Sequence, residues 1–463
     1  RYSPLRHPDR AQQRRELVID RMVDLNLVDK ATAAQARAEA LEIAGLMAGA
    51  VRRAPWAVDA AVDMVEEEMG SGSLSSSGLQ VHTHIQPLLQ RAAQQAVIQG
   101  MVELDQGYPK AAGAQAALVA VRISNGAVVA MVGGRKYADS PFNRATQAWR
   151  QAGSTVKPLT LLAALDEQPT LTPISVFVDE PISLQIDGRT WTPRNYDGQY
   201  VGEISLRRAI ETSRNIPAIK LAQSVGSQKQ QQFFLQAGLT KATDLPSAAL
   251  GAFAATPLQM AGAYTAFPGG GTAHEPQLVS AVIGTDGSLV HQYPNHPIRL
   301  ASTNSAAVAT SILEGAVTDG TATRAARYGV TGPAGGKTGT TDDYRDAWFV
   351  GFTPELAIAV WVGQDRGTLG LSGSRAALPT WARFAAASGT LGGDFPTPDG
   401  IEHADVCSQS RLVARPACPD TYLEVFRLGT VPEKDKCKDH GGPFVDMNRL
   451  FGGIFKRRPK NED

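Results

Sequence analysis

Three short motifs in this sequence supply the nucleophile, amines and hydroxyl groups that an acyl-transfer reaction requires. The first is Ser154-Thr155-Val156-Lys157, at the predicted start of a helix. A Ser and a Lys three residues apart on a helix share one face. A Ser hydroxyl needs a base, and Lys157 can serve if burial or a nearby cation lowers its pKa by roughly one to several units. The helix N-terminus adds a backbone N–H and a positive dipole end toward an oxyanion formed at Ser154.

The second motif, Ser213-Arg214-Asn215, offers another hydroxyl and an amide. Ser213 could relay a proton to a leaving group, and Asn215 could hold both Lys157 and the substrate backbone. The pattern is weak by itself, because residues 302–304 also satisfy it.

The third motif is Lys337-Thr338-Gly339-Thr340, at the predicted start of a strand. Its Gly lets a ligand lie against the backbone, while the Lys and the two Thr offer a cation and two hydroxyls to an anion. A Lys-Thr-Gly triplet alone is more often an exposed turn, and Ser-x-x-Lys is more often a helix cap followed by a surface Lys. Jointly, the three motifs predict a cleft whose wall is an inner strand bearing Lys337, with Lys337 helping to keep Lys157 neutral.

Two predicted hairpins and a mostly helical middle must position these motifs. The first hairpin joins residues 116–123 to 127–132 through an Asn-Gly turn, and the second joins 347–352 to 356–362. Their continuous apolar character predicts a sheet covered on both faces. The expected fold class is α+β, with a central antiparallel sheet whose edges come from both chain ends, flanked by helices. Helices are predicted over 10–25, 31–48, 57–69, 86–105, 154–165, 204–222, 257–267, 303–317 and 374–387.

Composition narrows the class of protein. A chain of 463 residues suggests two to four domains, and 45 basic against 45 acidic residues give no electrostatic case for nucleic-acid binding. No apolar run approaches the roughly 18 residues of a spanning helix. Because the chain opens on Arg1, we expect a fragment or a processed form whose membrane or export signals, if any, lie upstream. Cys407, Cys418 and Cys437 allow three disulfide pairings and leave one thiol over.

Together the motifs resemble those of the penicilloyl-serine transferases, and more narrowly the transpeptidase region of a class A penicillin-binding protein, a bifunctional bacterial peptidoglycan synthase. The resemblance covers roughly residues 50–390 and includes flanking segments: 130–134, 142–145, 191–196, 256–258, 320–322 and 346–349. It implies the penicillin-binding, serine β-lactamase-like fold with an all-helical subdomain. It also implies four parts: a glycosyltransferase remnant (1–50), a linker region (51–110), the transpeptidase domain (111–395) and a C-terminal extension (396–463). The only Glu-Asp pair is Glu462-Asp463, so we expect no glycosyltransferase site in this piece.

The resemblance implies a D,D-transpeptidase that acts on stem peptides ending in D-Ala-D-Ala. Ser154 would form the acyl-enzyme, Lys157 would take its proton, and Ser213 with Lys337 would pass a proton to the leaving D-Ala. The backbone N–H groups of Ser154 and Thr340 would form the oxyanion hole. The substrate carboxylate would be held by Lys337 and by the strand residues Thr338, Gly339 and Thr340, and Asn215 would position the acyl chain. β-Lactams would acylate the same Ser.

The same resemblance implies the location and the partners. No metal or organic cofactor is required. The protein would be anchored in the bacterial cytoplasmic membrane by a preceding segment, with its catalytic domain facing the periplasm or cell exterior. A homodimer and cell-wall regulatory proteins are further possible partners.

Three alternatives share this site. A D,D-carboxypeptidase uses every catalytic residue but passes the acyl group to water, and a penicillin-binding sensor would bind without turnover. A class A β-lactamase needs a deacylating Glu between the second and third motifs. The acids there are Asp244, Glu275, Asp286, Glu314 and Asp319, and none lies in the Glu-x-x-Leu-Asn context of such enzymes.

Overall fold

The computed structural model describes residues 8–39, 53–76, 78–186, 188–432 and 436–440. The chain divides into two compact units, Arg1–Arg53 and Ala54–Asp463, called unit 1 and unit 2 below. All three motifs lie in unit 2. The four-part organisation expected from the sequence stays a prediction, and the basic run at residues 456–460 lies outside the described residues.

Unit 1 is a helical hairpin of α1 (Pro8–Asp24) and α2 (Lys30–Ala38). The side chain of Asp29 accepts a hydrogen bond from the backbone N–H of Thr32 at 2.7 Å, which caps the start of α2. The sequence predicts that this helix continues through residues 40–48, which lie outside the described part of the chain, and the described helix ends before them.

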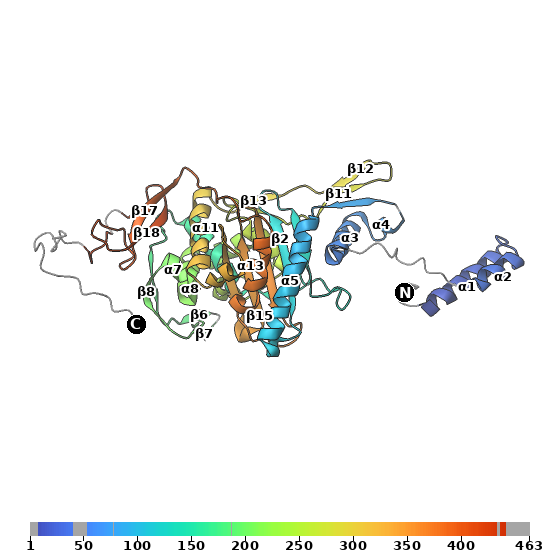
Figure 1. The fold of residues 1–463 in the computed structure, drawn as a ribbon, viewed down its shortest axis with the longest axis horizontal. Helices are drawn as coiled ribbons and strands as arrows, with labels where there is room; N and C mark the ends of the chain where they lie inside the picture. The colour runs from blue at the N-terminus through green and yellow to red at the C-terminus, as the bar shows by residue number, and fades with distance from the viewer. Residues whose placement is uncertain (1–7, 40–52, 77, 187, 433–435, 441–463) are drawn as a thin grey trace, which may run out of the picture. The chain divides into compact units, whose positions relative to one another are not determined.

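Unit 2 is built around a five-stranded antiparallel sheet with the strand order β14-β15-β16-β2-β3 (Figure 1). The strands are β2 (Gln115–Arg122), β3 (Val128–Val132), β14 (Gly335–Thr340), β15 (Asp346–Phe352) and β16 (Leu356–Gly363). Both predicted hairpins form, and Gly126 takes the positive φ of 71° in the turn of the first. Pairing of β16 with β2 joins them. The expectation that the two sheet edges come from opposite chain ends is confirmed.

One expectation about this sheet is wrong. The Lys-Thr-Gly strand was expected inside the sheet, whereas β14 is an edge strand paired only with β15 among the described residues. The reason lies in long-range pairing, because β2 pairs with the far side of the β15–β16 hairpin. An edge strand keeps one row of backbone N–H and C=O groups available to a ligand.

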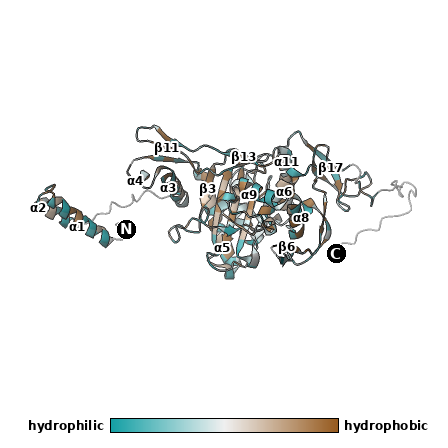
Figure 2. Cartoon of the chain, turned by 180° about the vertical axis from the view of Figure 1, so that it is seen from behind, coloured by the Kyte–Doolittle hydropathy of each residue, from teal (hydrophilic) through white to brown (hydrophobic). Residues whose placement is uncertain are grey.

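The sheet separates two hydrophobic cores. Along β2, alternate residues enter different clusters, with Val119 in one and Leu118 in the other. Helices α10 (Pro257–Tyr264) and α11 (Thr303–Thr318) contribute to the first cluster. Helices α5 (Pro87–Gly107) and α13 (Leu378–Ala387) contribute to the second, so both faces are covered. Figure 2 shows the apolar residues gathered in this central part. The expected burial of both sheet faces is confirmed.

Helices fill the rest of unit 2. The longer ones are α3 (Pro55–Met69), α5 (Pro87–Gly107), α6 (Lys157–Glu167), α7 (Leu206–Glu211), α8 (Asn215–Val225), α9 (Ser227–Gln236), α10 (Pro257–Tyr264), α11 (Thr303–Thr318) and α13 (Leu378–Ala387). Short turns of helix are α4 (Ser73–Ser76), α12 (Gly373–Ala376), η1 (Pro109–Ala111), η2 (Gly153–Val156), η3 (Pro246–Leu250), η4 (Thr323–Tyr328) and η5 (Asp342–Tyr344). In the described part of the chain, no helix is long and apolar enough to cross a membrane.

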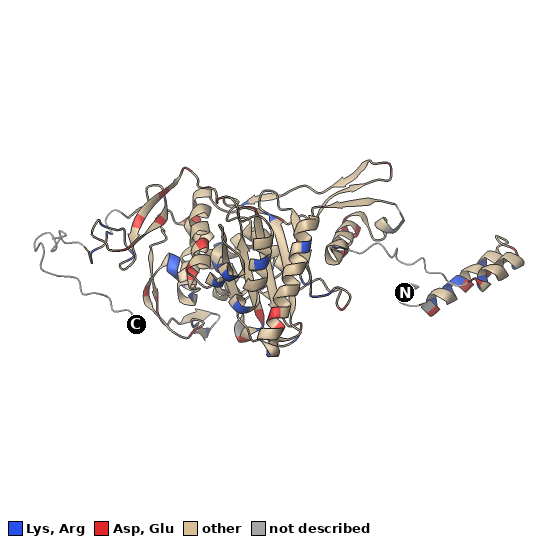
Figure 3. Cartoon of the chain, viewed as in Figure 1, with Lys and Arg blue, Asp and Glu red and all other residues tan. Residues whose placement is uncertain are grey.

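Small antiparallel ribbons complete the fold. One of them has three strands, β1 (Gln80–Thr83), β11 (Val279–Ile283) and β12 (Leu289–Gln292). The others are pairs: β4 (Arg150–Gln151) with β9 (Ala254–Ala255), β5 (Val176–Asp179) with β8 (Gly202–Ser205), and β6 (Leu184–Ile186) with β7 (Arg189–Trp191). Two further pairs are β10 (Thr272–His274) with β13 (Pro297–Arg299) and β17 (Ile401–Cys407) with β18 (Thr421–Arg427). Figure 3 shows acidic and basic residues interspersed along the chain, in keeping with the balanced charge. The α+β class with a central antiparallel sheet is confirmed.

Candidate active site

Ser154 and Lys157 lie in one continuous helical segment that begins as a 3₁₀ turn. Ser154 belongs to η2. Lys157 is the first residue of α6, and Pro158 is the second. In a 3₁₀ turn residues three apart nearly eclipse, so the two side chains leave the backbone on the same side. Gly153 takes a positive φ of 57° just before them, which an L residue with a side chain rarely adopts. The predicted helix start is therefore confirmed.

The amine of Lys157 is buried and points into the second motif. Its Nζ donates to the backbone oxygen of Ser213 at 2.7 Å and to Asn215 Oδ1 at 2.6 Å. It also lies 3.2 Å from the Arg214 oxygen and 3.4 Å from Ser213 Oγ. Among the described residues the Ser154 hydroxyl has no hydrogen-bond partner, so its predicted bond to Lys157 is not formed here. Catalytic hydrogen bonds often tighten only when substrate is bound.

The second motif lies where the sequence predicts an uninterrupted helix over 204–222, and that expectation is wrong. Residues 202–205 form β8, α7 follows, and the chain breaks at Thr212–Arg214 before α8 begins at Asn215. Ser213 has a positive φ of 61°, an uncommon conformation for a residue with a side chain. Strained residues of this kind cluster at functional sites. The break turns Ser213 and Asn215 toward Lys157.

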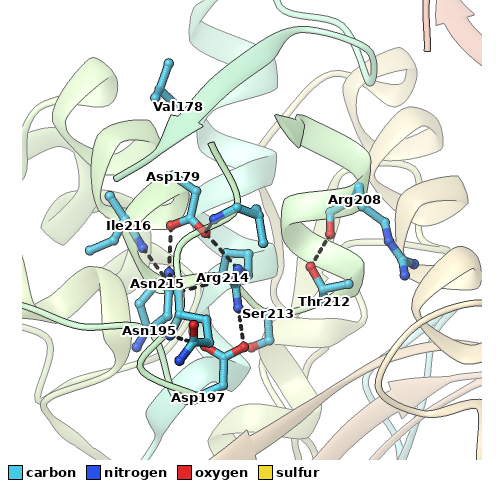
Figure 4. Close-up of polar contacts among 12 residues, drawn as sticks. Val178, Asp179, Asn195, Asp197, Arg208, Thr212, Ser213, Arg214, Asn215 and Ile216 are labelled. Carbon is cyan, nitrogen blue, oxygen red and sulfur yellow. Dashed lines mark hydrogen bonds and ion pairs between the residues drawn. The ribbon is translucent and has the colours of Figure 1, made fainter. Parts of the chain in front are cut away.

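An ion-pair network centred on the buried side chains of Arg214 and Asp179 holds this break in place (Figure 4). The Arg214 guanidinium bridges two carboxylates, with Nε 2.8 Å from Asp179 Oδ2 and Nη1 2.7 Å from Asp197 Oδ2. The Asn195 amide donates to Asp179 Oδ1 at 2.6 Å, and its oxygen accepts from the backbone N–H of Asn215 at 2.8 Å. Asp179 is 1% exposed, so removal of Arg214 would leave a buried unpaired carboxylate.

The third motif forms the edge of the sheet beside Ser154. Lys337 is fully buried, and its Nζ donates to the Thr338 oxygen at 3.1 Å. The Thr338 hydroxyl lies 2.8 Å from the Thr321 hydroxyl, and the Thr340 hydroxyl accepts from the backbone N–H of Gly373 at 3.1 Å. In the described part of the chain, no hydrogen bond joins Lys337 to Ser213. The contact expected for passing a proton between these two side chains is therefore not formed here.

Two glycines allow β14 and the Ser154 turn to touch. A Cβ added to Gly339 would lie 2.7 Å from Thr155 Cγ2 and 3.2 Å from the Ala152 oxygen. A Cβ added to Gly153 would lie 3.2 Å from the Thr340 oxygen. The first of these distances is closer than carbon atoms pack. Close backbone approach therefore explains the Gly at both positions.

Burial and charge act together on the two lysines. Desolvation lowers the pKa of Lys157 well below its ordinary value, and the positive charges of Lys337 and then Arg214 lower it further, while Asp179 opposes them. Desolvation also lowers the pKa of Lys337 to about 7. A depressed amine pKa near the working pH is what a general base requires.

Several residues of this site were missed or left without a role by the sequence. Asp179 and Asp197 carry no motif, and an isolated Asp gives no signal that it will be buried against an Arg. Asn195 and Thr321 lie in segments that resemble the family but had no assigned function. Tyr196 and Tyr344 join the loops beside the second and third motifs through their hydroxyls, with ring centroids 5.6 Å apart.

Comparison with known proteins places this geometry in a family. The model of the penicillin binding protein transpeptidase domain matches residues 116–380, and that of the penicillin-binding protein 1A C-terminal domain matches residues 397–442. Penicillin-binding protein 1A of Neisseria meningitidis is 36% identical over 348 residues, which are 71% of this chain and 42% of that protein. Penicillin-binding protein 1B of Vibrio cholerae is 29% identical over 456 residues, 97% of this chain and 58% of that protein. The chain thus spans about half the length of these relatives.

Solved structures of penicillin-binding proteins share the fold of this chain. Penicillin-binding protein 1A from Haemophilus influenzae superposes with a TM-score of 0.75 at 24% identity, over 94% of this chain and 84% of that one. The penicillin-binding protein PonA1 from Mycobacterium tuberculosis gives a TM-score of 0.62 at 26% identity, over 74% of this chain and 94% of that one. The chain therefore belongs to the penicillin-binding proteins and contains their transpeptidase domain, with homology to the class A penicillin-binding proteins 1A and 1B.

Proposed function

We propose that this chain is a serine-type peptidoglycan D,D-transpeptidase. Ser154 Oγ attacks the carbonyl carbon of the penultimate D-Ala of a stem peptide as neutral Lys157 accepts its proton. The backbone N–H groups of Ser154 and Thr340 stabilise the oxyanion. The bond to the terminal D-Ala then breaks, and Ser213 and Lys337 deliver a proton to the departing amine. This leaves an ester on Ser154.

The second half of the reaction consumes that ester. The amine of a neighbouring stem peptide attacks the ester carbonyl and gives up a proton, which replaces the one that Ser213 and Lys337 delivered in the first half. The Ser154 oxygen leaves and regains a proton from Lys157. During the first half, Lys337 and the hydroxyls of Thr338 and Thr340 hold the donor carboxylate, which departs with the terminal D-Ala. Asn215 positions the acyl chain in both halves. No metal or organic cofactor enters these steps.

The observation that carries this proposal is the surroundings of the Lys157 amine. The amine is buried, has a depressed pKa, and hydrogen bonds to Ser213 and Asn215, three positions after a Ser at the start of the same helical segment. A surface Lys following a helix cap would show none of these properties. The arrangement supports a nucleophile, its base and a second hydroxyl that belong to one site.

The geometry supports transpeptidation over β-lactam hydrolysis. Among the acids between the second and third motifs, burial raises the pKa of Glu314 to about 7, as a general base would require. Its backbone nevertheless lies beside Gly335, at the opposite end of β14 from Thr340. A carboxylate there is not placed to activate water at Ser154.

Labelling with a fluorescent penicillin tests the proposal. We expect a stable adduct on the full chain, located at Ser154 by mass spectrometry of its peptides. Ser154→Ala should abolish the label, since the nucleophile is lost, and its unchanged thermal melt would show that the fold is intact. An adduct on another residue, or a label that survives Ser154→Ala, overturns the assignment.

The acceptor is identified in a second assay. Incubation with a stem pentapeptide and an acceptor amine should give more cross-linked product than free tetrapeptide, which is the product of hydrolysis. Predominant hydrolysis would identify the chain as a D,D-carboxypeptidase. Rapid turnover of nitrocefin would identify it as a β-lactamase. Stable penicillin labelling without either peptide product would identify it as a penicillin-binding sensor.

The relatives also support proposals for the wider setting of this chain. A structure of PonA1 from Mycobacterium tuberculosis was solved with penicillin V, which supports β-lactams as inhibitors here. We propose that the protein works at the bacterial cytoplasmic membrane with its catalytic domain on the periplasmic or outer side. Anchoring by a preceding segment, a homodimer and regulatory partners of the cell wall belong to the same proposal.

A further inference from the structure

Three cysteines and one histidine meet in the C-terminal part of unit 2, at a distance in sequence from the catalytic motifs. The ligand atoms of Cys407, Cys418, Cys437 and His440 all lie within 4.8 Å of one another. The Nδ1 atom of His440 is 3.2 Å from Cys437 Sγ and 3.5 Å from Cys407 Sγ. Cys407 and Cys437 are fully buried.

We propose that these four residues bind a structural Zn²⁺ ion. Zinc takes thiolate sulfur at about 2.3 Å and imidazole nitrogen at about 2.0–2.1 Å in a tetrahedron, which places neighbouring ligand atoms about 3.5–3.8 Å apart. Of the two sulfur–nitrogen distances in the cluster, 3.5 Å falls in that range and 3.2 Å is slightly shorter. Three sulfurs and one imidazole nitrogen are ligands that favour zinc over Mg²⁺ or Ca²⁺. Four protein ligands leave no open position, so the site is structural and not catalytic.

Backbone hydrogen bonds bring the ligands together without help from the ion. Cys407 ends β17, and its neighbour Val406 forms a β-bridge with Val413, which forms another with Lys436. The backbone N–H of Cys437 donates to the Val413 oxygen at 2.8 Å. These bridges set Cys407 and Cys437 on adjacent segments.

Local geometry completes the set. Cys437 and His440 are three residues apart, which is a common spacing for two ligands of one zinc ion. The backbone N–H of Arg415 points at Cys418 Sγ from 3.3 Å. Outer hydrogen bonds of this kind orient metal ligands and stabilise thiolates.

The segment has little else to hold it. The described residues of 408–420 and 428–440 contain turns and isolated bridges but no helix or strand. Their local core consists of Ile174, Val406, Val413 and Phe426. A core this small does not fix an irregular segment, and small modules of this kind use a disulfide or a metal as a cross-link.

A disulfide accounts for the cluster less well than zinc. One bond would join two of the sulfurs and leave the third thiol and the imidazole of His440 with no role in the cross-link. The sequence left the pairing of the three cysteines open, and it gave no reason for a histidine to join them. Zinc uses all four groups at once.

The proposed site would also fix one wall of a cleft near the second catalytic motif. Residues 409–411, which begin two positions after Cys407, line a cleft of about 640 Å³ together with Asp197 and Arg214. Figure 1 shows β17 and β18 beside α11. The ion therefore stabilises a segment that borders the buried network around Arg214.

Metal retention by the full chain tests the proposal. The chain is reduced under argon, given a small excess of Zn²⁺, desalted, and measured for metal and protein. We expect about one zinc ion per chain in the wild type. Cys437→Ser and His440→Asn should retain at least tenfold less, because each loses one of four ligands. His403→Asn is the matched control, because His403 is an exposed histidine of β17, and it should bind zinc like the wild type.

Cobalt gives a readout that needs no variant. Co²⁺ added to the reduced wild type should produce thiolate-to-cobalt charge-transfer absorption and the intense visible bands of a tetrahedral site. Zn²⁺ should remove both by displacement. Penicillin labelling of Ser154 in each variant reports whether the catalytic domain remains folded, so a loss of metal can be separated from a loss of fold.

The outcomes decide between the alternatives. Zinc retention that is equal in the wild type and Cys437→Ser overturns the proposal, as do weak cobalt bands of an octahedral ion. A wild-type chain isolated without reductant that is lighter by the mass of two hydrogen atoms has a disulfide, which also overturns it. The full mass with three free thiols after denaturation supports it. The zinc, cobalt and mass measurements do not depend on the activity of Ser154.

Discussion

At the scale of single residues, the site depends on the placement of two buried lysines near each other. A buried ammonium is costly, so burial lowers the pKa of both amines, and the charge of Lys337 lowers that of Lys157 further. Because the pKa of Lys337 is about 7, its charge, and with it the repulsion on Lys157, grows as the pH falls through neutrality. Lys337 thus has three proposed roles, as a carboxylate ligand, as the partner of Ser213 in proton delivery, and as a charge that keeps the base neutral.

Replacing Lys337 by Ala should move the pH profile of acylation. Neutral Lys157 is the proposed base, so the acylation rate falls as the pH drops through its pKa. Without the repelling charge that pKa rises, and the acidic limb should shift to higher pH by roughly one unit. The measurement is the second-order rate constant for penicillin acylation, followed from about pH 5 to about pH 10.

Lys337→Arg is the matched control for this shift. An Arg stays charged throughout the range, so the acidic limb should remain at or below the wild-type pH even if the rate constant drops. Identical midpoints in Lys337→Ala and the wild type would exclude Lys337 as a cause of the depressed pKa.

At the scale of elements, the site is a contact between a strand edge and a helix start. β14 and η2 approach so closely that Gly339 faces the Thr155 side chain and the Ala152 oxygen, and Gly153 faces the Thr340 oxygen. The indole N–H of Trp348 donates to the Gln151 oxygen at 2.9 Å, which ties β15 to the segment before Ser154. The hydroxyl of Tyr264 donates to the Thr155 oxygen at 2.5 Å from the other side. These bonds set the distance between Ser154 and Thr340.

Gly339→Ala should separate these two elements. The new methyl carbon would lie 2.7 Å from Thr155 Cγ2, so either the strand or the turn must shift. We expect a loss of about 1–3 kcal/mol in the free energy of unfolding and a roughly 100-fold slower acylation. Thermal melts and penicillin kinetics measure the two effects.

Gly107→Ala provides the comparison, because Gly107 ends α5 and has nothing within 4 Å of its added Cβ. It should change the free energy of unfolding by less than about 0.5 kcal/mol. If Gly339→Ala were acylated at the wild-type rate, Ser154 and β14 would not need to lie this close.

At the scale of the whole molecule, the two units differ in what they contribute. Unit 2 contains both faces of the sheet, the three motifs and the described hydrophobic clusters, whereas unit 1 is a helical hairpin. Within unit 2, the β17–β18 ribbon docks through Glu424, which accepts from Arg207 Nε at 2.6 Å, and through Arg427, which donates to the backbone oxygens of Gln168 and Leu171 at 2.8 Å each.

A chain that begins at Ala54 should keep the acylation rate and melting temperature of unit 2, because its core and site residues all remain. A chain that stops before Ile401 should instead melt at a lower temperature, since Arg207 and Glu211 lose Glu424 from their buried network. Penicillin kinetics and thermal melts of both truncated chains check this contrast. Loss of acylation in the first chain would show that unit 1 supports the catalytic site.

Much of this protein could be predicted from sequence because its signals are local. The Asn-Gly pair marks its hairpin because the turn needs a residue at positive φ, which Gly126 supplies, and continuous apolar runs report burial of both sheet faces. Ser154, Lys157, Ser213, Asn215 and Lys337 were found from residue type, spacing and order, and the comparisons confirm the family that this order indicated. The catalytic roles of these residues remain proposals.

The rest depends on contacts between distant parts of the chain, and a local pattern does not record them. Helical periodicity continues across residues 204–222, but pairing with β5 turns the start into a strand and the Arg214 network breaks the helix before Asn215. Pairing between hairpins decided that β14 lies at the sheet edge. The meeting of Cys407, Cys418, Cys437 and His440 required two bridges through Val413. Sequence alone thus determined which groups are available, and only tertiary structure decided which of them face one another, because burial and long-range pairing are properties of the folded chain.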